Sequence, residues 1–216
     1  MKDFFDTSLN EDSLEDIVEK HNITKLLEFE RYFRDNNMYD RQEECYAQNS
    51  VVTISWYQGD GKEFVRRSAR SAAKHKNAYF QPKHRINNTF IWLNKDKALA
   101  EMQCEMFNYH IVDGDLYDRG GYARLLYRVI KENGTWKIAG LDCIYEKDYL
   151  YPVYPNGKKI DSSEFENYRQ SYQCMTYVFE QEGRPVKEDL PGDDRPDLVN
   201  KLYKEANAWL YEGEES

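Results

Sequence analysis

Helix-type spacing of apolar residues marks the first part of the chain. With Asn22 as its N-cap, this pattern predicts a helix that ends at Asp35, preceded by a separate turn over 13–18. A short amphipathic helix is predicted over 40–48, and another over 62–77 after a break at 59–61. The apolar positions of the first of these predicted helices are Ile23, Leu26, Leu27, Phe29 and Phe33.

Strand-type patterns dominate the middle of the chain. β-branched and aromatic residues predict one strand over 50–57, and four antiparallel strands are predicted over 84–93, 98–110, 121–131 and 135–145. Residues 112–115 read as a polar loop, whereas Asn133-Gly134 is a type I′ hairpin signal. Because helices cluster early and strands late, the pattern favours an α+β fold over a parallel doubly wound sheet.

The composition changes after residue 147, so we divide the chain into a main domain, 1–147, and a helical extension, 148–216, packed on it. The extension begins with an aromatic, proline-punctuated stretch over 149–155, followed by a predicted helix over 162–181 and a turn over 190–196. A last helix is predicted from one apolar face: Leu198, Val199, Leu202, Tyr203, Ala206, Trp209 and Leu210.

Composition and charge narrow the functional classes. The 216 residues carry a net charge of −9, which disfavours nucleic acid as a partner, and we assign the basic stretch over 66–76 to a solvated helix face. The chain lacks an apolar run of the ~20 residues that span a membrane and a signal-peptide core, so we expect a cytoplasmic protein that binds no membrane. The 18 tyrosines, apolar in the ring and polar at the tip, favour a lined cavity.

Motifs for common cofactors are missing from the sequence. It contains no P-loop, no dinucleotide-binding glycine motif, no nucleophile elbow and no paired His or carboxylate motif for a metal. The four cysteines are far apart and form no C-x-x-C pair, so we expect reduced core residues. We therefore expect neither a cofactor nor a bound metal.

Five short motifs, in this order and spacing, resemble the NTF2-like (cystatin-like) cone and specifically SnoaL-like proteins over residues 10–147. They are Tyr32-Phe33-Arg34-Asp35, the stretches 46–52 and 82–88, Gly120-Gly121-Tyr122, and the stretch 134–140. The resemblance implies a curved antiparallel sheet packed on N-terminal helices. It also implies a homo-oligomer, dimer or trimer, that covers the open sheet face, unless the C-terminal helix covers that face within one chain.

Within this family the sequence is similar to the branch that holds scytalone dehydratase and hexachlorocyclohexane dehydrochlorinase. Members carry an Asp at the end of the first helix and a His that opens the strand after the third helix, here Asp35 and His84. A further pocket His falls on His110 or Tyr109, with the register left open. Scytalone dehydratase has a Ser and an Asn where this chain has Ala123 and Leu125, so scytalone is not the expected substrate.

The resemblance implies a proton-transfer site. A histidine titrates near neutrality, and a neighbouring carboxylate fixes its tautomer and raises its basicity. We assign His84 as the base, Asp35 as the group that orients it, with Asp40 as the competing carboxylate, and His110 as an assisting residue. Each of these histidines alone is more commonly a satisfied strand or loop residue. The aromatic residues expected to bind substrate are Tyr57, Trp56, Tyr122, Tyr127, Phe107 and Tyr109.

Two functions follow from this reading. The first is a cofactor-independent dehydratase, another lyase, or an isomerase that acts on a small cyclic or aromatic hydrophobic substrate. The second is a non-catalytic module of the same fold that binds a small ligand or forms oligomers. The position of Asp35 relative to His84 separates the two, because a working pair must lie within hydrogen-bond reach in a cavity.

Overall fold

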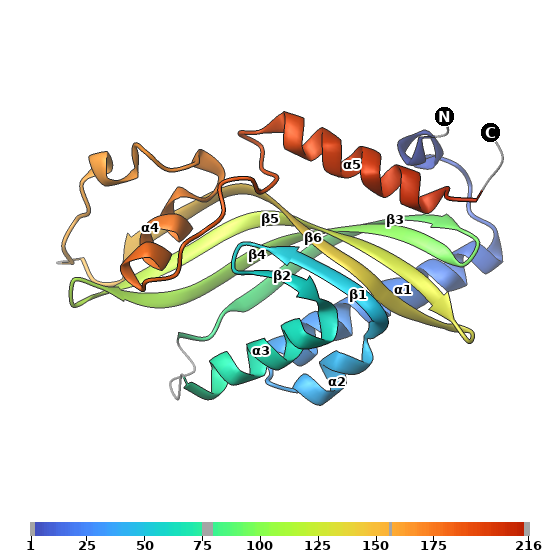
Figure 1. The fold of residues 1–216 in the computed structure, drawn as a ribbon, viewed down its shortest axis with the longest axis horizontal. Helices are drawn as coiled ribbons and strands as arrows, with labels where there is room; N and C mark the ends of the chain where they lie inside the picture. Colours follow the sequence, from blue (N-terminus) through green and yellow to red (C-terminus); the bar gives the residue numbers. More distant parts are fainter. Residues whose placement is uncertain (1–2, 75–79, 156, 214–216) are drawn as a thin grey trace.

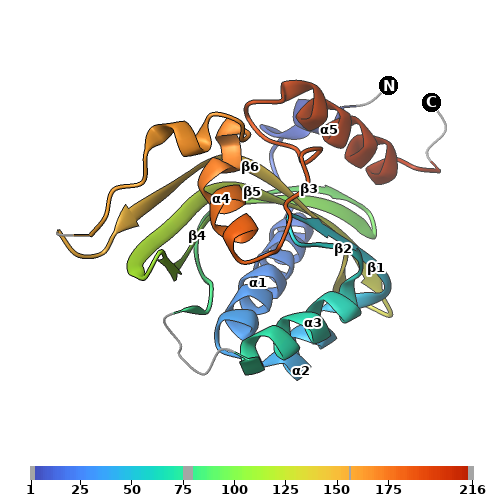
Figure 2. The same ribbon diagram turned by 60° about the vertical axis from the view of Figure 1, so that its left-hand side comes forward.

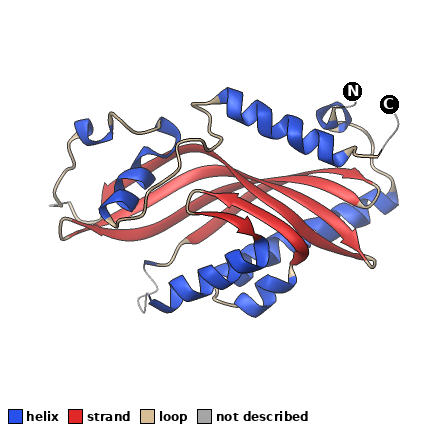
Figure 3. Ribbon diagram, in the orientation of Figure 1, coloured by secondary structure: helices blue, strands red, loops and turns tan. Residues whose placement is uncertain are grey.

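The chain folds around one curved sheet with helices on both faces (Figures 1 and 3). The computed structural model describes residues 3–74, 80–155 and 157–213. The six strands lie in the order β2-β1-β6-β5-β4-β3. Their bounds are β1 Tyr46–Ile54, β2 Tyr57–Asp60, β3 Lys83–Asn94, β4 Lys97–Val112, β5 Asp115–Glu132 and β6 Thr135–Pro152. The helical elements are η1 Phe4–Thr7, α1 Leu14–Asp35, α2 Tyr39–Glu44, α3 Gly61–Lys74, η3 Ser162–Phe165, η4 Gln170–Tyr172, α4 Gln173–Gln181 and α5 Pro196–Leu210.

The predicted α+β class is confirmed, with one correction to the sheet. Strands β3 to β6 form an antiparallel meander, and β2 pairs antiparallel with β1. Strand β1, however, runs parallel to β6, with Thr53 opposite Asp142. The sheet is therefore mixed, because the chain returns to β1 only after passing through α3 and the whole meander.

The first helix is longer than predicted, and Asn22 lies inside it. The helix begins at Leu14, where the Ser13 side chain accepts a hydrogen bond from the Asp16 backbone and Asp16 accepts one from Ser13 in return. This capping box outcompetes Asn22 as the start. The turn expected over 13–18 is thus the first part of α1. The predicted helix over 62–77 corresponds to α3, and its residues 75–77 lie outside the described ranges.

Strands β4, β5 and β6 extend beyond their predicted bounds. Asp113 and Gly114 both have positive φ, 52° and 88°, and form a two-residue hairpin in place of the expected loop. Strand β6 continues to Pro152, so the boundary drawn after residue 147 falls inside a strand. The helix predicted over 162–181 is instead two short 3₁₀ turns followed by α4.

Successive side chains of a strand point to opposite faces of the sheet, and in this sheet both faces carry buried apolar residues. On β4, Ala98, Ala100 and Met102 join the core beneath α1, whereas Leu99 points to the opposite face. That opposite face is covered by α5 and η1, which lie side by side in Figures 1 and 2. The C-terminal helix therefore covers, within one chain, sheet surface on which the resemblance implied a subunit contact.

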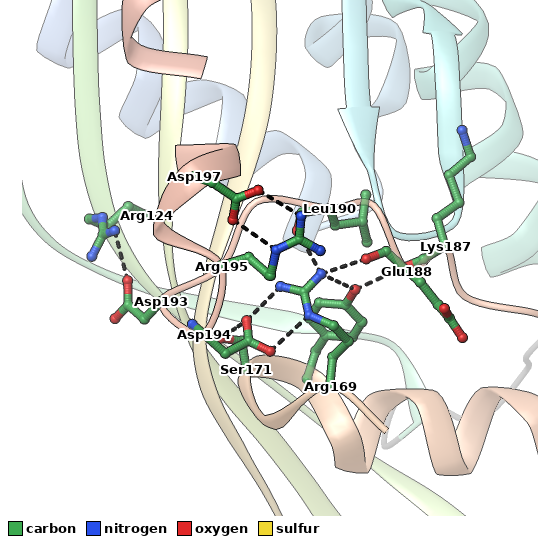
Figure 4. A network of polar contacts seen from close by, with 11 residues as sticks. Arg124, Arg169, Ser171, Lys187, Glu188, Leu190, Asp193, Asp194, Arg195 and Asp197 are labelled. Atoms are coloured by element: carbon green, nitrogen blue, oxygen red, sulfur yellow. Dashed lines mark hydrogen bonds and ion pairs between the residues drawn. The ribbon is translucent and has the colours of Figure 1, made fainter. Parts of the chain in front are cut away.

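A polar clamp joins two segments of the extension, before α4 and before α5 (Figure 4). Asp194 accepts hydrogen bonds from Arg169 Nε at 2.8 Å and Nη2 at 2.5 Å, and another from the Ser171 hydroxyl at 2.8 Å. The neighbouring backbone then hydrogen-bonds to β6, with Tyr145 N–H donating to the Pro191 carbonyl at 3.0 Å. The clamp thus fixes the segment that leads from α4 to α5.

Replacing Asp194 with asparagine is expected to loosen this segment without unfolding the sheet. Asparagine cannot accept two charge-assisted hydrogen bonds from Arg169, bonds that contribute ~1.5–3 kcal/mol each. Limited proteolysis between α4 and α5 should accelerate, while circular dichroism of the strands stays unchanged. Asp193→Asn is the matched control, since Asp193 is half exposed and contacts Arg124 on the surface. Equal cleavage of both variants would contradict a specific role for the clamp.

Candidate active site

A cavity of about 450 Å³ lies between the sheet and the helices α1, α3 and α4. Its walls are largely apolar and aromatic, and polar groups enter at a few points. Strand β4 contributes Cys104, Met106, Asn108 and His110, which follow one another at the two-residue spacing of one strand face. The helix α4 brings Met175 and Phe179 to the same space, so residues from the extension complete the wall.

The structure brings Asp35 and His84 together at the cavity wall. Asp35 is the last residue of α1, which stops there because Asn37 adopts a positive φ of 59°. His84 is the second residue of β3, and Lys83 before it donates a hydrogen bond to the Asp35 carbonyl. The end of the helix and the start of the strand are thereby held side by side.

Both oxygens of Asp35 are occupied by His84. Oδ2 accepts the His84 backbone N–H at 2.7 Å, and Oδ1 lies 2.6 Å from ring Nδ1. Nδ1 therefore carries the proton in the neutral ring, and Nε2 retains a lone pair. Among the described residues, no hydrogen bond engages Nε2, and His84 lines the cavity. This arrangement leaves a basic nitrogen for a ligand.

Burial and neighbouring charges keep His84 neutral. Burial lowers the pKa of the His84 imidazole below 6.5, and the positive charges of Arg31 and Arg34 lower it further, against the opposing effect of Asp35. Burial opposes the charge on Asp35, but the hydrogen bonds from His84 outweigh it and lower the pKa of that carboxyl below 3.8. An ionised carboxylate beside a neutral imidazole is the state that a general base requires.

Beneath this pair lies a buried ion pair that the sequence did not indicate. Glu30 accepts hydrogen bonds from Arg31 Nε and Nη2, both at 2.5 Å, from Gln42 at 2.6 Å and from the Tyr46 hydroxyl at 2.9 Å. Both charged side chains are almost fully buried. Burial opposes the charge on Glu30, yet Arg31 holds the pKa of that carboxyl below its usual 4.5.

His110 also reaches the cavity, but its ring is committed to other residues. Asn108 Nδ2 donates to Nε2 at 2.8 Å, and Nδ1 lies 2.8 Å from Glu182 Oε1 at the end of α4. Arg119 donates to Asn108 Oδ1 at 2.9 Å and so fixes the amide orientation. With both nitrogens engaged, His110 joins β4 to the extension and has no free lone pair.

The aromatic residues expected at the site divide into two groups. Trp56, Tyr109 and Tyr122 line the cavity, so Tyr109 and His110 both reach it. Phe107 is not among the lining residues, and its ring packs against the Arg85 guanidinium, whose Cζ lies 5.0 Å from the ring centre.

Tyr57 and Tyr127 are also corrections, since both belong to the core. The Tyr57 hydroxyl donates to the Asp60 carbonyl at 2.8 Å, and its ring packs on Phe64. Tyr127 is fully buried behind the cavity wall, and its hydroxyl has no hydrogen-bond partner among the described residues. The competing carboxylate, Asp40, is exposed on α2.

Sequence reasoning missed seven charged residues of the wall: Arg31, Arg34, Arg119, Lys147, Asp148, Glu182 and Arg184. The only signal for Arg34 was its position immediately before Asp35. Glu182 carried no signal, because its partner His110 lies 72 residues away in the chain. Among the described residues, no group of three or more His, Cys, Asp or Glu side chains is placed to hold a metal ion. No described helix is both long and apolar enough to cross a membrane.

Comparison with protein families decides where the chain belongs. The model of the SnoaL-like domain matches residues 15–142. This chain belongs to the SnoaL-like family. The matched region runs from α1 into β6 and includes both Asp35 and His84, whereas α4, α5 and the clamp lie outside it.

Individual relatives of this SnoaL-like protein are distant. Pea pathogenicity protein 2 of Fusarium vanettenii is 25% identical over 211 residues, which cover 92% of this chain and 88% of the relative. Two solved structures each cover 67% of this chain, match 97% of their own and have a TM-score of 0.52. They are a putative scytalone dehydratase from Novosphingobium aromaticivorans, 16% identical, and hexachlorocyclohexane dehydrochlorinase LinA-type3 from Novosphingobium barchaimii, 12% identical. At this identity they show a shared NTF2-like fold.

Proposed function

We propose that this SnoaL-like protein is a cofactor-independent lyase, of the dehydratase kind, or an isomerase, in which His84 removes a proton from carbon. The observation that carries the proposal is the 2.6 Å contact between His84 Nδ1 and Asp35, which leaves Nε2 available at the cavity wall. Two cavity-lining guanidiniums, those of Arg31 and Arg34, lie close enough to influence the His84 pKa. Arg34, which has no carboxylate partner among the described residues, would favour negative charge on a bound substrate as the proton leaves.

The proton can be followed through the proposed reaction. His84 Nε2 takes a proton from the carbon next to a carbonyl and becomes an imidazolium, while Asp35 stabilises the new charge through Nδ1–H. In an elimination, the same proton is then available to a departing hydroxide, which leaves as water. In an isomerisation, it returns to a different carbon of the substrate.

The test is exchange of carbon-bound hydrogen with solvent deuterium. We would incubate the full chain with small cyclic ketones, 2-tetralone among them, in deuterium oxide and follow the exchange by mass spectrometry. We expect exchange above the buffer rate for at least one ketone and loss of that excess in His84→Ala. Exchange that is equal in both proteins would contradict the assigned base, and the non-catalytic binding module would then be the better description.

The pH profile of this exchange is a second expected result. The reaction needs neutral His84, whose pKa lies below 6.5. The rate should be level near neutrality and fall only as the pH drops below 6.5 and passes the lowered pKa. Rates measured between about pH 4.5 and pH 8 locate this limb. A limb above pH 6.5 would mean that Asp35 dominates over burial and the arginines.

A further inference from the structure

Arg34 is the one arginine of α1 that faces the cavity without a carboxylate partner among the described residues. Its guanidinium Cζ lies 5.1 Å from the ring centre of Phe64 and 6.0 Å from that of Trp56. Nη1 donates to the Ser68 hydroxyl at 2.6 Å, and Ser68 in turn donates to the Phe64 carbonyl at 2.9 Å. The side chain is therefore held in place by two rings and a hydroxyl.

Two other cations of the cavity wall have a carboxylate partner, which Arg34 lacks. Arg31 is neutralised by Glu30 at 2.5 Å, and Arg184 forms an ion pair with Glu182. Arg119 has its Nε and Nη2 directed to His110 and Asn108. For Arg34, no carboxylate of a described residue lies within 4.0 Å, and the Ser68 contact uses one of its five N–H groups.

A charge without a counter-ion is costly to bury. Burial lowers the pKa of the Arg34 guanidinium below 12.5, and the like charge of Arg31 lowers it further. A bound anion would restore the balance, and a guanidinium fork matches a carboxylate with two parallel hydrogen bonds. The remaining wall near Arg34 offers rings and neutral polar groups, including Trp56, Phe64 and Ser71.

We propose that the cavity binds a small cyclic or aromatic carboxylic acid, with its carboxylate on the Arg34 guanidinium and its ring among the apolar side chains. The inference refines the proposed function by naming the chemical class of its substrate, and it rests on the same cavity. Arg34 and His84 both line this cavity, so a ligand whose carboxylate is held by Arg34 keeps its ring in the same space as the basic nitrogen.

The test compares two probes of the same shape, 2-naphthoate and its neutral amide, 2-naphthamide, by calorimetric titration of the full chain at neutral pH. We expect wild type to bind naphthoate at least about tenfold more tightly than naphthamide. Arg34→Gln should remove most of this preference and leave naphthamide binding nearly unchanged. Arg34→Lys, which keeps the charge but loses the fork, should fall between them.

Two control variants test whether the preference for naphthoate depends on Arg34. Lys147→Gln removes another cavity-lining cation and should keep the preference for naphthoate. If the preference survives Arg34→Gln and disappears in Arg119→Gln, the assignment to Arg34 is wrong. Equal binding of both probes by wild type, or no binding of naphthoate, would overturn the proposal without any variant.

Failure of this proposal is separable from failure of the proposed function. Binding of naphthoate requires no turnover, so it should persist in His84→Ala. A protein that prefers naphthoate through Arg34 but exchanges no carbon-bound hydrogen would be a binding protein for cyclic acids. A protein that exchanges hydrogen but binds both probes equally would keep His84 as its base and lose the acidic substrate class.

Discussion

Asp35→Asn is expected to lower the rate of hydrogen exchange by about 10²-fold or more, while the fold stays intact. The reason lies in the two contacts of the carboxylate. The asparagine carbonyl can still accept the His84 backbone N–H, which turns its amide NH₂ toward Nδ1. That group donates, so Nδ1 must accept and the ring proton moves to Nε2. The lone pair at the cavity wall is then lost.

This result is measured as the exchange rate at pH 7 and compared with a matched variant. Asp40→Asn removes the competing carboxylate, which is exposed on the neighbouring helix, and should leave the rate unchanged. Thermal melts of both variants check the fold. If Asp35→Asn keeps the wild-type rate, Asp35 does not select the tautomer of His84. If Asp40→Asn is the slower variant, the carboxylate was assigned to the wrong residue.

The sequence was most informative where local pattern and family resemblance agreed. The α+β class, the meander and the last helix followed from periodicity, and the motif order led to the SnoaL-like family. The pairing of Asp35 with His84 depended on that resemblance, since 49 residues separate them. Local pattern could not have found their contact, because it depends on the end of a helix meeting the start of a strand.

Strand register explains only the uncertainty on β4. A shift of one residue moves a side chain to the other face of a strand, so Phe107 and His110 could not be assigned before β4 was aligned. In the structure β4 pairs with β3, and His84 lies opposite Met106. The pairing register of the two strands then shifts between Ile86 and Thr89. Tyrosine-rich composition predicted a lined cavity but could not separate its lining from the core behind it.

The charged residues of the wall were missed for a different reason. Glu182 reaches His110 only because the extension folds back over the sheet, a contact across 72 residues. Arg31 and Glu30 are adjacent on α1, and the local pattern of the sequence carries no signal of their burial. Their burial results from the packing of α2 and β1, which bring Gln42 and Tyr46 onto Glu30.

The buried ion pair of Glu30 and Arg31 is expected to affect the stability of the fold. Arg31→Met is expected to lower the free energy of unfolding by about 3–5 kcal/mol, because it leaves Glu30 buried without its counter-ion. The double variant Arg31→Met with Glu30→Leu should lose less, since it removes the stranded charge together with the cation. Urea unfolding at pH 7 measures both, with Arg70→Met, an exposed pair on α3, as the control for loss of a surface cation.

The pH dependence of the stability loss in Arg31→Met tests whether the charge of Glu30 causes that loss. Without Arg31, burial should raise the pKa of folded Glu30 above its usual 4.5, the reverse of its direction in wild type. A raised pKa stabilises the folded state at low pH and loses that effect as the pH rises through it. The deficit of Arg31→Met should therefore shrink as the pH falls toward about 4.5. A deficit that is constant with pH, and equal in the double variant, would assign the stabilisation to the packing of the Arg31 side chain and not to its charge.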